Sequence, residues 1–253
     1  LQTKILFYCS RRSTKRSKGR ILNMKSKTVI KKLKLDQNGF EKIQNAVKNA
    51  ESKTSGEIAV CLAAESSDYS VWELFASLLC SVFCYAVMLP FSENIRRFYE
   101  QINWLSPEWY LPATFGIASF ITVLIFFFIF NIPCLDRLII PRDYRAKTVS
   151  KRAFAAFAET GVYCTEHHNG ILIYVSYLER QVRIIADKGI SEKISDDLWQ
   201  LIADSLSSEL EKGNAVSAYC DAIEKCGELL AEHFPIQKGD VNELPDGLLI
   251  LEN

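Results

Sequence analysis

The chain has 253 residues, with 30 basic and 30 acidic side chains, so its formal net charge at pH 7 is zero. This length accommodates one soluble domain together with a membrane anchor. Eight cysteines are present, but no C-x-x-C pair occurs, so neither a zinc knuckle nor a dithiol redox motif is supported. Cys80, Cys84 and Cys134 lie in or beside long hydrophobic runs, where thiols act as small apolar residues, and this placement argues against a disulfide framework. We therefore expect reduced thiols in a cytosolic compartment.

The charges are unevenly distributed along the chain. Residues 1–35 hold twelve basic side chains and no acidic one, which leaves 18 basic and 30 acidic side chains, a net charge of −12, for the rest. A basic arm is typical of attraction to anionic lipid or nucleic acid, or of a solvated tail. We interpret residues 1–35 as a disordered basic arm. The first methionine is Met24, so the residues before it are expected to be an over-extension of the native chain, and no nucleic-acid partner is expected.

Residues 36–70 form the first part of an α/β domain. Asp36–Lys53 reads as an amphipathic helix, with Asp36 or Asn38 as its cap, because apolar side chains recur at helical spacing from Phe40 to Ala50. Glu57–Leu62 is apolar and rich in β-branched residues, which predicts a strand.

Residues 71–135 are expected to form a transmembrane hairpin. Leu74–Ser92 runs for 19 residues and Trp109–Leu135 for 27 residues without a formal charge, and about 20 helical residues cross the hydrocarbon core. Aromatic residues lie at or near the ends of both runs, as in an aromatic belt; they are Trp72, Trp104, Trp109 and Tyr110.

The basic residues around the hairpin predict its orientation. The only basic residues in the segment 93–108 are Arg96 and Arg97. The segment after the second run is strongly basic, with Arg137, Arg142, Arg145, Lys147, Lys151 and Arg152. Because positive residues stay on the inner side, both termini are expected to be cytoplasmic. The lipid bilayer is thus the first predicted partner.

Residues 136–235 supply the second part of the domain, and residues 236–253 form a tail without a clear period. We predict a helix at Lys147–Glu159, strands at Gly170–Ser176 and Gln181–Ala186 joined as a hairpin, a helix from Ser195 with Leu198, Ile202, Leu206 and Leu210 inward, and a last helix at Ala215–His233. The fold class is α/β: a small mixed sheet with helices on both faces (an α/β/α sandwich), interrupted by the transmembrane hairpin.

Side chains with carboxylate or amide oxygens lie next to the ends of the predicted strands. Glu65 and Asp68 follow the first strand, Asn169 precedes the second and Asp187 ends the third. If the second and third strands are antiparallel, Asn169 and Asp187 share one edge. Such ligands could hold Mg²⁺ or Ca²⁺, which could activate water against a phosphate ester. The alternative is that all four are solvated loop residues that cap turns.

A zinc site is a weaker alternative. His167 and His168 are adjacent, His233 lies on the last helix, and Cys164 could add a fourth ligand. These residues otherwise read as polar loop positions before a buried strand. Glycines are scattered singly, so no phosphate-binding loop is predicted, and no catalytic residue is assigned.

Several runs of the sequence resemble the TPM-domain family. They are Thr54–Ile58 (TSGEI), Asn169–Ser176 (NGILIYVS) and Val182–Ile190 (VRIIADKGI), with Cys226–Pro235 and Asn242–Asp246 as further support. The resemblance covers about Leu35 to Leu251 and extends to the bacterial membrane-protein branch, in which two spans interrupt the domain. It implies an α/β/α sandwich and, for that branch, location in the cell inner membrane.

The resemblance also implies two functions. Some family members are described as acid phosphatases, and others are accessory proteins of membrane complexes. This chain lacks the acidic Asp-x-Ala-Gly-like opening before the first helix, which weakens the transfer of phosphatase activity. The first hypothesis is therefore an accessory or scaffold protein that engages a membrane-protein partner, and the alternative is a metal-dependent phosphatase at the membrane.

Overall fold

The computed structural model describes residues 23–102, 107–132, 139–165, 167–236 and 242–252, together with Leu135 and Arg137. The first 22 residues of the expected basic arm, Trp104 and part of the tail lie outside the described residues. The chain divides into two compact units. One combines the described parts of Leu1–Ser67 and Ala146–Asn253, and the other is Asp68–Arg145.

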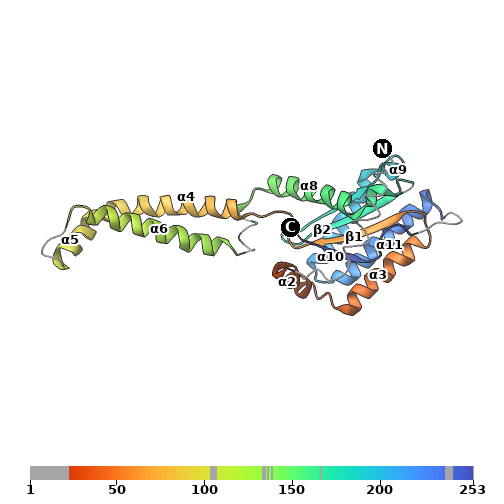
Figure 1. Ribbon diagram of the computed structural model, residues 1–253, viewed down its shortest axis with the longest axis horizontal. Coiled ribbons are helices and arrows are strands. Elements are labelled where there is room, and N and C mark those ends of the chain that lie inside the picture. Colours follow the sequence, from red (N-terminus) through yellow and green to blue (C-terminus); the bar gives the residue numbers. More distant parts are fainter. Residues whose placement is uncertain are drawn as a thin grey trace, which may run out of the picture. The chain divides into compact units, whose positions relative to one another are not determined.

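The first unit contains a four-stranded mixed sheet in the order β3-β2-β1-β4 (Figure 1). The strands are β1 (Glu57–Ala63), β2 (Gly170–Ser176), β3 (Gln181–Ala186) and β4 (Leu248–Leu251). β1 pairs in parallel with both β2 and β4. β2 and β3 pair antiparallel, which confirms the predicted hairpin.

Helices cover both faces of this sheet. They are α2 (Met24–Lys32), α3 (Gln37–Glu51), α8 (Arg142–Thr160), α9 (Lys188–Ser191), α10 (Asp196–Glu211) and α11 (Ala215–His233), with a 3₁₀ turn, η2, at Val162–Cys164. The alternating side chains of β1 divide between two cores: Ile58, Val60 and Leu62 face one side, and Ala59, Cys61 and Ala63 face the other. The predicted α/β fold with a mixed sheet is confirmed.

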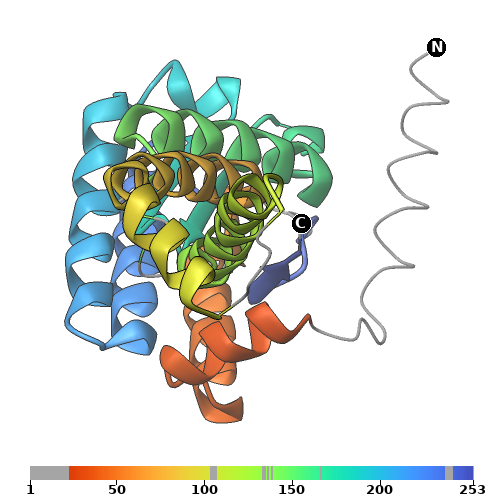
Figure 2. The same ribbon diagram turned by 90° about the vertical axis from the view of Figure 1, so that its left-hand side faces the viewer.

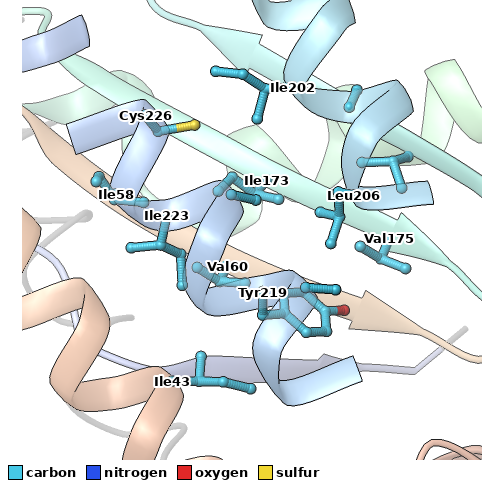
Figure 3. Close-up of a cluster of buried hydrophobic side chains, with 14 of the residues drawn as sticks. Ile43, Ile58, Val60, Ile173, Val175, Ile202, Leu206, Tyr219, Ile223 and Cys226 are labelled. Atoms are coloured by element: carbon cyan, nitrogen blue, oxygen red, sulfur yellow. The ribbon is translucent and has the colours of Figure 1, made fainter. Parts of the chain in front are cut away.

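The larger core lies between the sheet and α3, α10 and α11. Figure 3 shows Ile43 of α3, Ile223 of α11 and Leu206 of α10 directed toward the strands. Each such fully buried aliphatic side chain contributes about 1.5–3 kcal/mol through burial. The opposite face is covered by α8, whose small side chains at Ala153 and Ala156 are fully buried against the sheet.

Local signals explain where the helices begin and end. The side chain of Asp36 accepts a hydrogen bond of 2.7 Å from the Gly39 amide and caps α3, as predicted. Gly213 has a φ of 85° just after α10, a left-handed conformation that favours glycine. At Gly227 a Cβ would lie 2.7 Å from the Ala50 Cβ, so glycine permits the close approach of α11 and α3.

Three features differ from the sequence-based predictions. Part of the expected disordered arm is helical: Val29 of α2 and the following Leu33 join the larger core. The tail, read as having no period, contributes the edge strand β4. On α10 the predicted Ile202 and Leu206 are buried, but at the start of the helix the inward position falls on Trp199 and Leu198 is exposed. The prediction for Leu198 was wrong because the buried stripe continues from Leu206 and Ile202 to Trp199.

The second unit is built around two apolar helices, α4 (Ser70–Met88) and α6 (Tyr110–Phe130). They pack side by side, and the chain between them forms a 3₁₀ turn, η1 (Leu89–Phe91), and α5 (Ser92–Ile102). By length and composition, Ser70–Gln101 and Tyr110–Phe130 are both long and apolar enough to cross a membrane.

Candidate functional site

Strand direction decides which polar residues can meet. Because β1, β2 and β4 are parallel, all three end at one edge of the sheet, which we call the carboxyl edge. β1 and β2 begin at the opposite edge, the amino edge, where the antiparallel β3 ends. Glu65 follows β1 at the carboxyl edge, whereas Asn169 and Asp187 lie at the amino edge. Asp68 belongs to the second unit, so the sheet does not bring the four predicted metal ligands together.

The carboxyl edge holds a buried network that the sequence reasoning missed. The Ser66 hydroxyl lies 3.0 Å from the Tyr174 hydroxyl and 2.7 Å from the Ser176 hydroxyl. Glu179 accepts hydrogen bonds from the Ser66 amide, at 2.9 Å, and from the Ser176 hydroxyl. All three of Ser66, Ser176 and Glu179 are buried, and burial raises the pKa of Tyr174. The network clamps the β2–β3 turn onto the end of β1.

Glu65 precedes Ser66 in the chain and contacts α2. Its carboxylate forms a salt bridge of 2.7 Å with Lys25 of α2, whose side chain is largely exposed. An exposed ion pair of this kind contributes about 0–1 kcal/mol. The observed role of Glu65 is therefore to tie α2 to the carboxyl edge.

Asn169 is the most deeply buried of the predicted ligands, with 2% of its surface exposed. Its backbone amide donates to the Thr165 hydroxyl at 3.2 Å, its backbone carbonyl accepts from the Glu57 amide at 3.1 Å, and its side-chain amide donates to the Ser55 carbonyl. The side-chain oxygen Oδ1 has no hydrogen-bond partner among the described residues. A buried acceptor left unsatisfied costs about 1–3 kcal/mol, so a donor or a cation at this oxygen would be favourable.

Asp187 lies at the same edge as Asn169, as predicted for antiparallel β2 and β3. Its Oδ1 accepts from the Lys188 amide at 2.7 Å and caps α9, and its Oδ2 lies 3.0 Å from His168 Nδ1. Its backbone amide bonds the Gly170 carbonyl at 2.9 Å. Both carboxylate oxygens therefore already have partners, so a metal ion would have to displace one of them.

A cluster of three carboxyl groups lies near the start of β1. Glu51 Oε1 accepts from the Ile58 amide at 3.0 Å, and its Oε2 accepts from the Asn242 side chain at 3.3 Å. Asn242 also donates to Asp246. Burial, together with the charges of Glu57 and Asp246, raises the pKa of Glu51 to about 8. Glu51 is therefore largely protonated at neutral pH.

Glu57 and Lys48 complete this cluster. The two oxygens of Glu57 accept from the Glu243 and Leu244 amides at 3.2 and 3.3 Å. Lys48 reaches Asp246 at 3.7 Å. The carboxyl groups thus hold the segment that leads into β4. Sequence reasoning identified none of this cluster as a site, although the strand-opening position of Glu57 was its one visible signal.

The zinc alternative is not supported by the geometry. Among the residues that the structure describes, no group of three or more His, Cys, Asp or Glu side chains is arranged to hold a metal ion. His168 is directed to Asp187, and Cys164 forms no disulfide with any cysteine that the structure describes.

Comparison with known proteins identifies part of the chain. Residues 137–229 match the family model of the TPM domain. The matched TPM segment includes β2, β3 and α10, and with them Asn169 and Asp187. It is less than half of the chain.

A solved structure supports the fold. The NMR structure of the BA42 protein from the psychrophilic bacterium Bizionia argentinensis aligns with a TM-score of 0.50 and 23% sequence identity, over 85% of this chain and 94% of that one. At this identity the likeness concerns the fold alone. The search of curated proteins found no match.

Proposed function

We propose that the chain is a bacterial integral membrane protein in which α4 and α6 anchor a TPM-type α/β domain, and that this domain serves as an accessory or scaffold for a membrane-protein partner. The proposal combines the TPM match over residues 137–229 with the character of the helix pair. The observation that carries it is that both helices expose large apolar side chains while the buried stripe of α4 is polar.

The buried stripe of α4 is polar and its outer surface is apolar. Ser77 is fully buried, whereas Phe83 is 71% exposed. On α6, Phe128 is 72% exposed. In water each large apolar side chain left outside forfeits about 1.5–3 kcal/mol of burial free energy. Within lipid the same side chains are solvated and small polar residues are suited to the helix interface.

The helix lengths and contacts fit a spanning pair. At 1.5 Å per residue, the 19 residues of α4 and the 21 of α6 rise about 28 and 31 Å, close to the hydrocarbon thickness of about 30 Å. Ser81 of α4 donates to the Ser119 carbonyl of α6 at 3.0 Å and lies 3.0 Å from the Thr122 hydroxyl. Interhelical bonds of this kind stabilise pairs in membranes.

The charge distribution supports inner-membrane placement with both termini in the cytoplasm. A cysteine introduced at Gln101 should react with a membrane-impermeant maleimide added to spheroplasts, whereas one at Lys212 should react only after lysis. The protein should also resist carbonate extraction. Release into the carbonate supernatant would refute membrane integration, and labelling of position 212 alone from outside would reverse the orientation.

Two exposed leucines on α10 support an accessory role. Leu198 and Leu201 lie three residues apart on the outer surface of the helix, and adjoining exposed apolar side chains favour protein contacts. Leu201→Glu should shift the native-gel mobility of the detergent-extracted protein to that of the purified chain, whereas Ser208→Glu, the same charge change at another exposed position of α10, should leave it unchanged. Equal mobility of extracted and purified wild-type protein would argue against a partner.

The alternative is a metal-dependent acid phosphatase, and the observation that favours it is the buried Oδ1 atom of Asn169, which has no partner among the described residues, at the same edge of the sheet as Asp187. Oxygen ligands suit Mg²⁺ or Ca²⁺, and the bound ion would supply an activated water. Calcium and magnesium binding should be measured calorimetrically together with phosphate-ester hydrolysis, for the wild type and the near-isosteric Asn169→Asp and Asp187→Asn variants. Binding and hydrolysis that change together in both variants would establish this function, and hydrolysis that survives unchanged would exclude the site.

A further inference from the structure

The helix α5, between the two apolar helices, has sharply separated faces. Apolar side chains recur at Phe91, the last residue of η1, and at Ile95 and Phe98 of α5, an i, i+4, i+7 spacing that places them on one side. The opposite side carries Glu93, Arg96, Arg97 and Glu100. Arg96 and Glu100 form an i,i+4 ion pair at 2.9 Å. A helix with one apolar stripe and one charged face is suited to a boundary between apolar and aqueous phases.

Contacts within the second unit fix α5 at the end of the helix pair. The η1 turn, which contains Pro90, separates α5 from α4, and α5 runs across the end of the pair in both views (Figures 1 and 2). The ring centroids of Tyr99 and Tyr110 lie 4.4 Å apart, in an edge-to-face arrangement. Thr114 of α6 donates to the Tyr99 hydroxyl at 3.2 Å. α5 is therefore held against the first turns of α6.

Aromatic side chains at this end point outward. Phe98 of α5 is 60% exposed and Trp109, at the start of α6, is 65% exposed. Phe91, on the same side of the chain as Phe98, is exposed too. Aromatic residues are enriched where the hydrocarbon core meets the headgroups.

The lengths of the spans place these side chains in depth. If α4 and α6 cross the core, the hydrocarbon ends near Met88 and Tyr110, because each helix matches the core thickness. α5 then begins four residues beyond the end of α4, at the level of the headgroups. Its four charged residues exclude it from the core.

We propose that α5 is an interfacial helix: it lies along the membrane boundary at the end of the helix pair where α4 and α6 are connected, with Phe91, Ile95 and Phe98 in contact with the upper acyl chains and Arg97 in water. This inference rests on the proposed membrane function. Its partner is the lipid surface itself, and since the two acidic and two basic residues of the charged face balance, the seating depends on the apolar face rather than on anionic lipid.

The test uses the full-length protein reconstituted into phosphatidylcholine vesicles. Six of the eight cysteines are replaced by alanine, and the buried Cys61 and Cys226 are kept. Burial raises the pKa of each to about 12, so neither reacts with maleimide at neutral pH. A single cysteine is then introduced at Phe98, at Arg97 or at Phe83, and labelled with a polarity-sensitive fluorophore.

At position 98 we expect blue-shifted emission and quenching by a nitroxide placed high on the acyl chain, as for a helix face buried about 5–10 Å. We also expect quenching by aqueous iodide to be weaker at position 98 than at position 97, by roughly threefold or more. The adjacent position 97 is the matched control on the charged face. Position 83 reports on the span and should be quenched by a deep nitroxide.

Each remaining outcome contradicts the inference in a different way. Equal iodide quenching at positions 98 and 97, with position 83 deep, would place α5 in water and leave the proposed membrane function standing. Deep quenching at position 98 would place α5 in the core. Iodide quenching at position 83 would overturn the membrane function and the interfacial helix together.

Discussion

Replacement of Glu51 by glutamine tests the carboxyl cluster at the start of β1. Burial raises the pKa of Glu51 from 4.5 to about 8 in the folded protein, so the folded state retains a proton that the unfolded chain releases. The stability contributed by this proton is complete below about pH 4.5 and is lost as the pH rises to about 8. The Glu51→Gln variant has no such proton and should not lose stability over this window.

The magnitude follows from the size of the pKa shift. A rise of about 3.5 pH units, at about 1.36 kcal/mol per unit, gives an upper bound of about 5 kcal/mol. Since Glu51 is only partly buried, solvent screening reduces this to about 1–3 kcal/mol. The glutamine oxygen can still accept from the Ile58 amide, whereas the 3.3 Å bond from Asn242 is lost. The free energy of unfolding of the variant, relative to that of wild type, should therefore rise by about 1–3 kcal/mol between pH 5 and pH 8.5.

The assay is urea unfolding of the full-length protein in detergent. Unfolding is monitored by hydrogen exchange in peptides from β1 and β2. Glu41→Gln, on the exposed side of the same helix α3, is the matched control and should leave the pH dependence unchanged. If the stability of Glu51→Gln falls between pH 5 and pH 8.5 as much as that of wild type, the reasoning from burial is refuted.

Three further predictions use other contacts. Gly227→Ala should destabilise the protein by about 1–3 kcal/mol, because the new Cβ would lie 2.7 Å from that of Ala50. In urea unfolding, the double variant Gly227→Ala/Ala50→Gly should recover part of this stability. If the effects of the two substitutions simply add, the two Cβ atoms do not clash. Ser81→Ala should weaken the association of α4 and α6 by about 0.5–1.5 kcal/mol. The association is measured by the SDS-induced separation of fluorophores on the two helices. No change would mean that the Ser81–Ser119 hydrogen bond is not formed in micelles. Cys61 and Cys226 should stay unlabelled by maleimide at pH 7.5 for as long as the domain is folded, since burial raises the pKa of both thiols to about 12; rapid labelling detected by mass spectrometry would contradict their burial.

The elements with strong local signals were predictable from the sequence. α11 was predicted with the bounds observed, and the β2–β3 hairpin followed from two apolar runs and a short polar turn. The elements that were missed depend on distant partners. β4 is four residues long and, among the described strands, pairs with β1 alone, nearly two hundred residues earlier. The basic residues of α2 concealed the few apolar side chains, such as Val29, that attach it to the core.

The candidate site was predictable only in part, for the same reason. Asn169 and Asp187 flank one hairpin, so strand direction alone places them at one edge. Glu65 could be assigned to the other edge only once β1 was known to run parallel to β2. Glu51 and Asp246 are brought together by β4 and the segment before it, and no local pattern links positions so far apart.

The parallel pairing of β1 and β2 also constrains the helix pair that lies between them in the chain. The two strands are in register from Glu57–Gly170 to Ala63–Ser176, so both must lie on the same side of any membrane. An odd number of crossings between them would place β1 on the other side of the membrane from β2 and prevent the β1–β2 ladder, which joins the two halves of the sheet, from forming. α4 and α6 must therefore either both cross or both remain outside. Because α4 and α6 both present apolar side chains outward and both match the hydrocarbon thickness, the helix pair favours two crossings over none, and the register of the sheet is compatible with that arrangement.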